Sequence, residues 1–123
     1  MSDDRRRHER RIVRIPDNKA FFRLHIHDQW HAIDNVHDAS ISGMGIHFTQ
    51  AIASGTPVKI LFVSRDFEIV LNARIRWCQN ETQEPGLSEN GDVYRLGIEF
   101  DPKHLEDNVL MFMALRKYLD GFC

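Results

Sequence analysis

Apolar and polar residues alternate along most of the chain between residues 22 and 100. In the first such run, Phe22, Leu24 and Ile26 are separated by arginine and histidine. A period of two residues is typical of a β-strand that has one buried face. Similar runs occupy residues 44–48, 58–62, 67–77 and 94–100. We therefore predict about six short antiparallel strands in a barrel or sandwich, because no helical pattern separates them.

Two polar segments between these runs predict connections of different kinds. Residues 64–66, Ser-Arg-Asp, separate two adjacent runs and predict a short hairpin connection. Residues 79–92 contain Pro85, Gly86 and Gly91 and almost no apolar side chain. This second segment predicts a long exposed loop, and such loops often contact partners.

The C-terminal segment changes from the strand period to a helical one. Asp101 followed by Pro102 is a favourable helix start, since the carboxylate can cap the helix and proline suits its first position. We predict a helix over residues 102–120 that packs on the barrel; a dimer or partner face is the alternative. Its expected apolar face consists of Leu105, Val109, Phe112, Leu115, Leu119 and Phe122, widened by Leu110, Met111 and Met113.

Composition and charge distribution limit the classes of function. The chain has 123 residues, 42% of them hydrophobic and 28% charged, which fits a single soluble domain. The net charge is −2, but residues 1–14 contain six arginines and only three carboxylates. Positive charge is thus concentrated at one end, which indicates a local anion site and not a general polyanion binder. We expect a cytoplasmic protein without a membrane span, in which Cys78 and Cys123 are reduced thiols.

The arginine-rich segment contains the spacing Arg-x-x-x-Arg at Arg10 and Arg14, with Arg11 between them. Guanidinium groups donate paired hydrogen bonds to phosphate oxygens and to the O6 and N7 acceptors of guanine. Two such groups near one ligand would neutralise two phosphate charges. Taken alone, the segment fits a solvated basic tail better than a ligand site. The pairs Arg6/Arg10 and Arg7/Arg11 satisfy the same spacing, and we favour Arg10/Arg14 because Arg14 directly precedes Ile15-Pro16.

A second motif, Asp38-x-Ser40-x-x-Gly43, lies between a run that ends near Val36 and the strand predicted from Met44. Asp38 can accept hydrogen bonds from guanine N1–H and N2–H₂, and Ser40 can bond a phosphate or ribose oxygen. Gly43 would let the backbone approach a ligand closely. A simple polar turn between strands is the other interpretation, because Asp, Ser and Gly all favour turns. The two motifs together favour a split site for a nucleotide with more than one phosphate.

In this order and strand context, the two motifs resemble those of PilZ domains, bacterial receptor modules for cyclic di-GMP. The family combines RxxxR with [D/N]xSxxG some twenty to thirty residues later. Glu9-Arg10-Arg11, Arg76-Trp77 and the segment 94–100, Tyr-Arg-Leu-Gly-Ile-Glu-Phe, extend the similarity over roughly residues 9–118. One departure is Ser42, where family loops often have glycine.

The resemblance implies a mainly all-β fold, a six-stranded antiparallel β-barrel of PilZ type with a C-terminal α-helix. Residues 1–14 would form a flexible basic arm that carries RxxxR, and residues 15–123 the barrel with helix 102–120. The ligand-binding residues implied for cyclic di-GMP are Arg10, Arg11, Arg14, Asp38, Ser40 and Gly43. No further cofactor is expected.

The implied function is a cyclic di-GMP receptor or adaptor that changes conformation on binding and signals to an unidentified downstream protein. The alternative is a PilZ-like protein-interaction adaptor that does not bind nucleotide. We expect no DNA or RNA partner, because the acidic remainder of the chain opposes one. A monomer or weak dimer is expected.

Neither catalysis nor metal binding is predicted. No paired carboxylates, Ser/His/Asp set or phosphate-binding glycine loop is present in a suitable context. Among the seven histidines, His25 and His27 share one strand face, but alternation places that face toward solvent and no cysteine completes a ligand set. We therefore expect neither catalytic residues nor a metal site.

Overall fold

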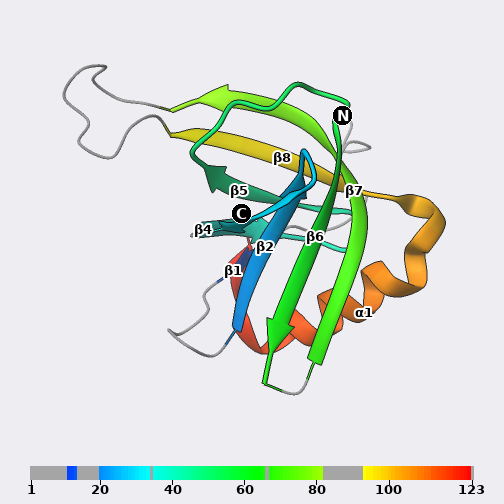
Figure 1. Ribbon diagram of the computed structural model, residues 1–123. Coiled ribbons are helices and arrows are strands. Elements are labelled where there is room, and N and C mark those ends of the chain that lie inside the picture. The colour runs from blue at the N-terminus through cyan, green and yellow to red at the C-terminus, as the bar shows by residue number, and fades with distance from the viewer. Residues whose placement is uncertain (1–10, 14–19, 34, 66, 82–92, 123) are drawn as a thin grey trace, which may run out of the picture.

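Nine antiparallel strands and one α-helix form the part of the chain that the computed structural model describes, residues 11–13, 20–33, 35–65, 67–81 and 93–122 (Figure 1). The strands are β1 (Arg11–Val13), β2 (Ala20–Ile26), β3 (Gln29–Ile33), β4 (Asn35–Ala39), β5 (Gly43–Phe48), β6 (Pro57–Ser64), β7 (Phe67–Asn80), β8 (Tyr94–Phe100) and β9 (Leu119–Phe122). Two short 3₁₀ segments, η2 (Pro102–His104) and η3 (Arg116–Tyr118), flank the helix α1 (Leu105–Leu115).

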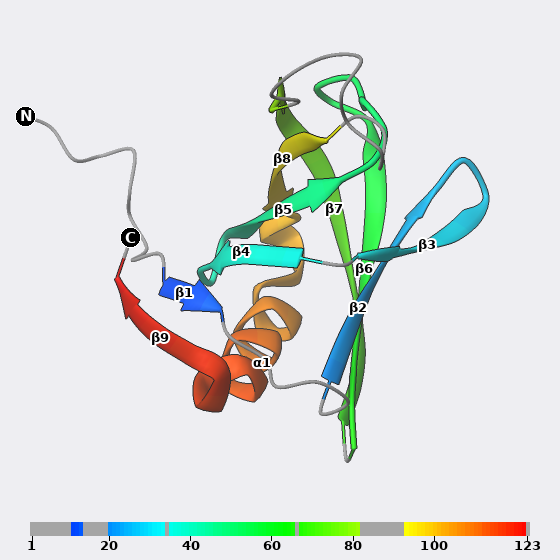
Figure 2. The same cartoon turned by 90° about the vertical axis from the view of Figure 1, so that its left-hand side faces the viewer.

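The strands form one sheet in the order β3-β2-β6-β7-β8-β5-β4-β1-β9. The sheet curls into a half-barrel, with β2, β6 and β7 on one side and β8, β5 and β4 on the other (Figures 1 and 2). The long strand β7 takes part in both sides, since it pairs with β6 along one edge and with β8 along the other. The predicted antiparallel β fold with a C-terminal helix is confirmed.

Alternate residues of the strands fill the concave side of the sheet. Leu24, Ile46, Ile60, Phe62 and Ile75 are completely buried. Burial of one such side chain contributes on the order of 1.5–3 kcal/mol to folding. The alternating pattern of the sequence thus identified most core-facing positions. Trp77, the last apolar residue of the run 67–77, is an exception, because a register shift between Ile75 and Trp77 leaves it 39% exposed.

The strand count is the first correction, because nine strands are present among the described residues and not six. The hairpin of β2 and β3 turns through His27 and Asp28, which both have positive φ angles of 52° and 63°. A two-residue turn of this kind usually contains asparagine or glycine, so the sequence gives little sign of it. The segment 29–39 also lacks a regular apolar alternation, and the sequence pattern therefore does not predict β3 and β4 as separate strands. The predicted hairpin between residues 64 and 67 is present.

The C-terminal segment begins as predicted but ends differently. The Asp101 carboxylate accepts a hydrogen bond from the backbone N–H of Lys103 at 2.9 Å, and Pro102 starts the first turn. Helix α1 packs next to β7 and buries Met111 and Leu115, whereas Leu105, Leu110 and Met113 stay exposed.

The predicted helix extends to residue 120, but residues 119–122 form strand β9 and pair with β1. Pairing with β1 satisfies the backbone groups of this segment, and Gly121 is unfavourable in a helix. Residues 11–13 of the expected flexible arm likewise belong to the sheet, as β1. No helix in the described ranges is long and apolar enough to cross a lipid bilayer.

Candidate functional site

The Asp38-x-Ser40-x-x-Gly43 motif forms the end of β4, the turn that follows, and the first residue of β5. The turn is closed by a hydrogen bond from the Ser40 N–H to the Gly43 carbonyl oxygen at 2.8 Å. The buried Ser40 Oγ accepts from the Ser42 N–H at 3.2 Å and lies 3.1 Å from Ser42 Oγ. Ser42, which stands where the family often has glycine, therefore helps to hold the Ser40 side chain in this turn.

Gly43 is required by the packing of two strands. A Cβ atom at this position would overlap the carbonyl oxygen of Ile98 on the neighbouring strand β8. That oxygen belongs to the backbone and cannot move aside easily. The structure thus gives Gly43 a role in strand packing, in addition to the ligand approach expected from the sequence.

A β-bulge brings two consecutive polar side chains to the outer face of β4. The register shifts between Val36 and Asp38, which pair with Ile46 and Gly45 of β5. Because the bulge inserts one residue, His37 and Asp38 lie on the same face and their side chains meet, with His37 Nδ1 3.0 Å from Asp38 Oδ2. Bulges are common beside functional sites for this reason.

Asp38 is a buried carboxylate, with only 4% of its surface exposed. Besides His37, the guanidinium of Arg95 on β8 lies 3.5 Å from its Oδ2 atom, and the same nitrogen lies 3.3 Å from His37 Nδ1. A carboxylate in such a position needs polar partners, since an uncompensated buried charge is costly. His37, Asp38 and Arg95 therefore form one polar cluster, here named the Asp38 cluster.

An exposed tryptophan adjoins this cluster. The register aligns Asp38, Gly45, Gly97 and Trp77 across β4, β5, β8 and β7. The Trp77 indole fills the space above Gly97, where a Cβ atom would overlap it, and the Asp38 carboxylate lies close to Gly45. The Arg95 guanidinium carbon lies 5.9 Å from the centre of the Trp77 ring, and Trp77 is 39% exposed. A flat aromatic surface thus stands beside a buried carboxylate.

A second polar network borders the cluster. His47 on β5 contacts Asn35 Nδ2 through its Nδ1 at 2.9 Å and Glu81 Oε1 through its Nε2 at 3.1 Å. The rings of His37 and His47 are 6.2 Å apart. These contacts join β4, β5 and the residue after β7. In the described ranges, no group of three or more His, Cys, Asp or Glu side chains is arranged to hold a metal ion.

Strand β1 brings the arginine-rich segment beside the turn motif. Arg11 pairs with Ala39 and Ile12 with Asp38, and β1 lies between β4 and β9 (Figure 2). Arg10 and Arg14 lie outside the described residues, as does the side chain of Arg11. Their ligand contacts, and the choice among the three arginine spacings, therefore stay predictions. The backbone pairing nevertheless explains how motifs some twenty-five residues apart come together.

His37, Trp77 and Arg95 belong to neither of the two sequence motifs. Arg76-Trp77 and Tyr94-Arg95 contribute to the resemblance to PilZ domains, but the sequence alone gives them no function. The strand period could have indicated that Arg95 belongs to the site, because Arg95 is two residues before Gly97 and both therefore face the same side of the sheet. The bulges at Val36/Asp38 and Ile75/Trp77 cannot be read from the sequence pattern, however, and they decide which side chains reach this face.

The fold and the motifs define a class of small β domains in which the turn after one strand lies next to a strand from the arginine-rich N-terminal segment. A sequence model of the PilZ domain matches residues 4–119. The chain belongs to the PilZ domain family. No curated protein has a significant sequence match to it.

Solved structures show the same fold. The chain is similar to the PilZ domain of YcgR from Escherichia coli with c-di-GMP, with a TM-score of 0.63, 18% identity and 92% of each chain covered. It is also similar to MrkH of K. pneumonia in complex with c-di-GMP, with a TM-score of 0.62 and 17% identity. That match covers 91% of this chain and 55% of MrkH. Apo MrkH gives a TM-score of 0.62 at 16% identity, over 96% of this chain and half of MrkH.

Proposed function

We propose that the protein is a receptor for cyclic di-GMP, and that the nucleotide binds where β1 meets the turn after β4. The observation that carries the proposal is the pairing of Arg11 with Ala39 and of Ile12 with Asp38. This pairing of residues 11 and 12 with residues 39 and 38 supports a site to which the RxxxR and DxSxxG segments both contribute. Family membership and the c-di-GMP complexes of the YcgR and MrkH structures support the same ligand.

The chemistry of the two segments fits the two parts of the ligand. Arg10, Arg14 and the additional Arg11 would neutralise the two phosphates through charge-assisted hydrogen bonds. Asp38 would accept from the N1–H and N2–H₂ groups of one guanine. Ser40 and Gly43 would shape the turn at the ligand's edge.

Trp77 and Arg95 extend the proposed site beyond the residues of the two motifs. The exposed indole offers a stacking surface for a purine, and stacking of one base on an aromatic side chain contributes about 1–3 kcal/mol. The Arg95 Nε atom is buried without an acceptor among the described residues, which adds donor capacity next to Trp77. A ligand that offers a hydrogen-bond acceptor to the Arg95 Nε–H group would satisfy this donor.

Binding would order the N-terminal segment and so alter the surface that a downstream protein contacts. Ordering costs about 1–2 kcal/mol per residue, which the hydrogen bonds to the phosphates would offset. The protein would thus act as a receptor and adaptor without catalysing a reaction. A PilZ adaptor that binds only protein is the second candidate, because His37 and Arg95 already satisfy Asp38 without ligand.

Isothermal titration with cyclic di-GMP separates the two candidates. The wild-type protein is expected to release heat on binding, and the double variant Arg10→Ala/Arg14→Ala to bind at least tenfold more weakly. Arg116→Ala is the matched control, since it removes an exposed arginine at the other end of the chain. Absence of binding by the wild type, or undiminished binding by the double variant, would contradict the proposal.

A further inference from the structure

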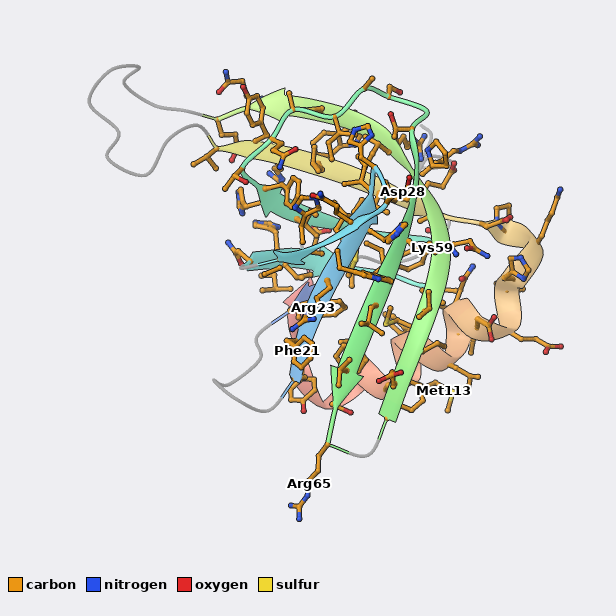
Figure 3. The ribbon with its side chains drawn as sticks, viewed as in Figure 1. Phe21, Arg23, Asp28, Lys59, Arg65 and Met113 are labelled. Carbon is orange, nitrogen blue, oxygen red and sulfur yellow. The ribbon has the colours of Figure 1, made fainter. Side chains whose placement is uncertain are left out.

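The outer face of strands β2, β6 and β7 has a chemistry that the proposed nucleotide site does not use. The strand register aligns Phe21, Val63 and Glu68 in one row, and Arg23, Leu61 and Val70 in the next. Figure 3 shows Phe21, Arg23 and Lys59 on this side of the molecule. Phe21 and Val70 are 45% and 44% exposed, which is unusual for large apolar side chains on a sheet.

Positive charge surrounds these apolar residues. The strands β2, β6 and β7 contain Arg23, Lys59, Arg74 and Arg76 but a single carboxylate, Glu68. The Arg23 guanidinium lies over the Phe21 ring, 5.1 Å from its centre. In the described part of the chain, neither Arg23 nor Lys59 forms an ion pair, although both are exposed. Exposed carboxylates are also present, Glu68 on β7 and Asp28 in the turn after β2 (Figure 3), but the basic residues outnumber them. Residues 15–123 together, in contrast, have a net charge of −5.

A groove of about 710 Å³ lies at the end of this face, between β6, β7 and η2. Its lining includes His25, Lys59, Asn72, Arg74 and Lys103. Two carboxylates also line the groove, but both have partners.

Glu99 pairs with Arg74 at 2.9 Å, and Asp101 accepts from the Lys103 N–H. Asp101 keeps its negative charge, but neither carboxylate forms an ion pair with Lys59 or Lys103 in the described part of the chain. The two ammonium groups are therefore available for an incoming acidic group. The volume of the groove falls in the range that binds small molecules or peptide side chains.

We propose that this face docks an acidic segment of another protein, one in which carboxylates alternate with apolar side chains. The carboxylates would bind Lys59 and Lys103 in the groove and Arg23 beyond it. The apolar side chains would cover Phe21, Leu61 and Val70. Charge complementarity carries this choice of partner, and it is independent of the nucleotide proposal.

Three other occupants fit the face less well. A second copy placed symmetrically would bring Arg23 and Lys59 of both chains together, and such like charges repel. Nucleic acid binding relies on neutralising many phosphates, whereas this face has few unpaired cations and several apolar side chains. The clusters of four to eight basic residues that recognise a lipid surface lie beside a membrane span or on an amphipathic helix, whereas the basic residues of this face lie on a sheet and Arg74 among them is paired with Glu99.

Selection from a random display library of 12-residue peptides tests the proposal. The full chain would be the immobilised target, and the double variant Arg23→Glu/Lys59→Glu the counter-target. Selected peptides are expected to be rich in Asp and Glu alternating with apolar residues. When synthesised, they should bind the double variant at least tenfold more weakly than wild type, with binding that weakens as salt is added.

Controls distinguish loss of the surface from loss of the fold. Lys59→Gln/Lys103→Gln is a milder variant that should also weaken binding, whereas Arg116→Glu should bind the peptides like wild type. All variants should keep the wild-type response to cyclic di-GMP, so failure of the nucleotide proposal would leave this test intact.

Peptides without acidic enrichment, or equal binding to Arg23→Glu/Lys59→Glu, would overturn the proposal. The same holds if vesicles with 30% phosphatidylserine or a 20-nucleotide single-stranded DNA bind through these residues in preference to the peptides.

Discussion

The two outer faces of the curled sheet differ in how their charges are satisfied. On the β4–β5–β8 side, Asp38 is buried and contacts His37 and Arg95. On the β2–β6–β7 side, Arg23 and Lys59 are exposed and have no carboxylate partner in the described part of the chain. The first face is a preorganised polar cluster that suits a small, defined ligand. The second is a surface whose exposed cations lack carboxylate partners in the described part of the chain, and it suits a larger partner of opposite charge.

The largest expected effect concerns the glycines that shape the first face. Gly43→Ala should lower the free energy of unfolding by about 3 kcal/mol, because the new methyl group would overlap the backbone oxygen of Ile98. Gly97→Ala should cost clearly less, because the obstacle there is the Trp77 side chain, which can rotate toward solvent. Urea unfolding of both variants measures the difference. Equal losses would show that the β5–β8 packing is not as tight as described.

Removal of a carboxylate should affect the two faces differently. Asp38→Ala is expected to cost about 1–3 kcal/mol of stability, because the variant leaves the partly buried Arg95 and His37 without their shared acceptor. Glu68→Ala removes an exposed carboxylate from the other face and should change stability by less than about 0.5 kcal/mol. Thermal or urea unfolding compares the two. A larger loss of stability in Glu68→Ala than in Asp38→Ala would contradict the proposed difference between the two faces.

The two tryptophans allow a smaller but more specific comparison. Trp77→Ala should weaken cyclic di-GMP binding by about 1–2 kcal/mol, roughly five- to thirtyfold, since it removes the proposed stacking surface. Trp30→Ala is the matched control, because Trp30 is similarly exposed but lies on β3 and packs against His25. Isothermal titration of both variants with cyclic di-GMP gives the ratio of their dissociation constants. If both variants bind cyclic di-GMP with equal affinity, Trp77 is not part of the binding site.

Much of the fold could be predicted because the apolar period directly reports which side of a strand is buried. Phe22, Leu24 and Ile26 illustrate this, and so does the hairpin between Ser64 and Phe67. The end of the helix could not be predicted, because Leu119 fits a helical face as well as a strand. Its pairing with Val13 decides the outcome, and this contact joins opposite ends of the chain.

The candidate site was located in the sequence only where its residues form a local motif. Asp38, Ser40 and Gly43 lie within six residues and were identified together. Arg95 and Trp77 join them through strand register and two bulges, which no local pattern reveals. The buried state of Asp38 is likewise a tertiary property, since alternation alone would place an aspartate in solvent.

The fluorescence of Trp77 tests the central claim most directly, because the chain contains only two tryptophans. In the variant Trp30→Phe, Trp77 is the sole tryptophan, and in Trp77→Phe it is Trp30. If cyclic di-GMP binds at the Asp38 cluster, its addition should change the emission of the first variant in a saturable manner and leave the second unchanged. If calorimetry detects binding while the emission of Trp77 stays constant, or if only Trp30 responds, the nucleotide binds elsewhere and the proposed site is wrong.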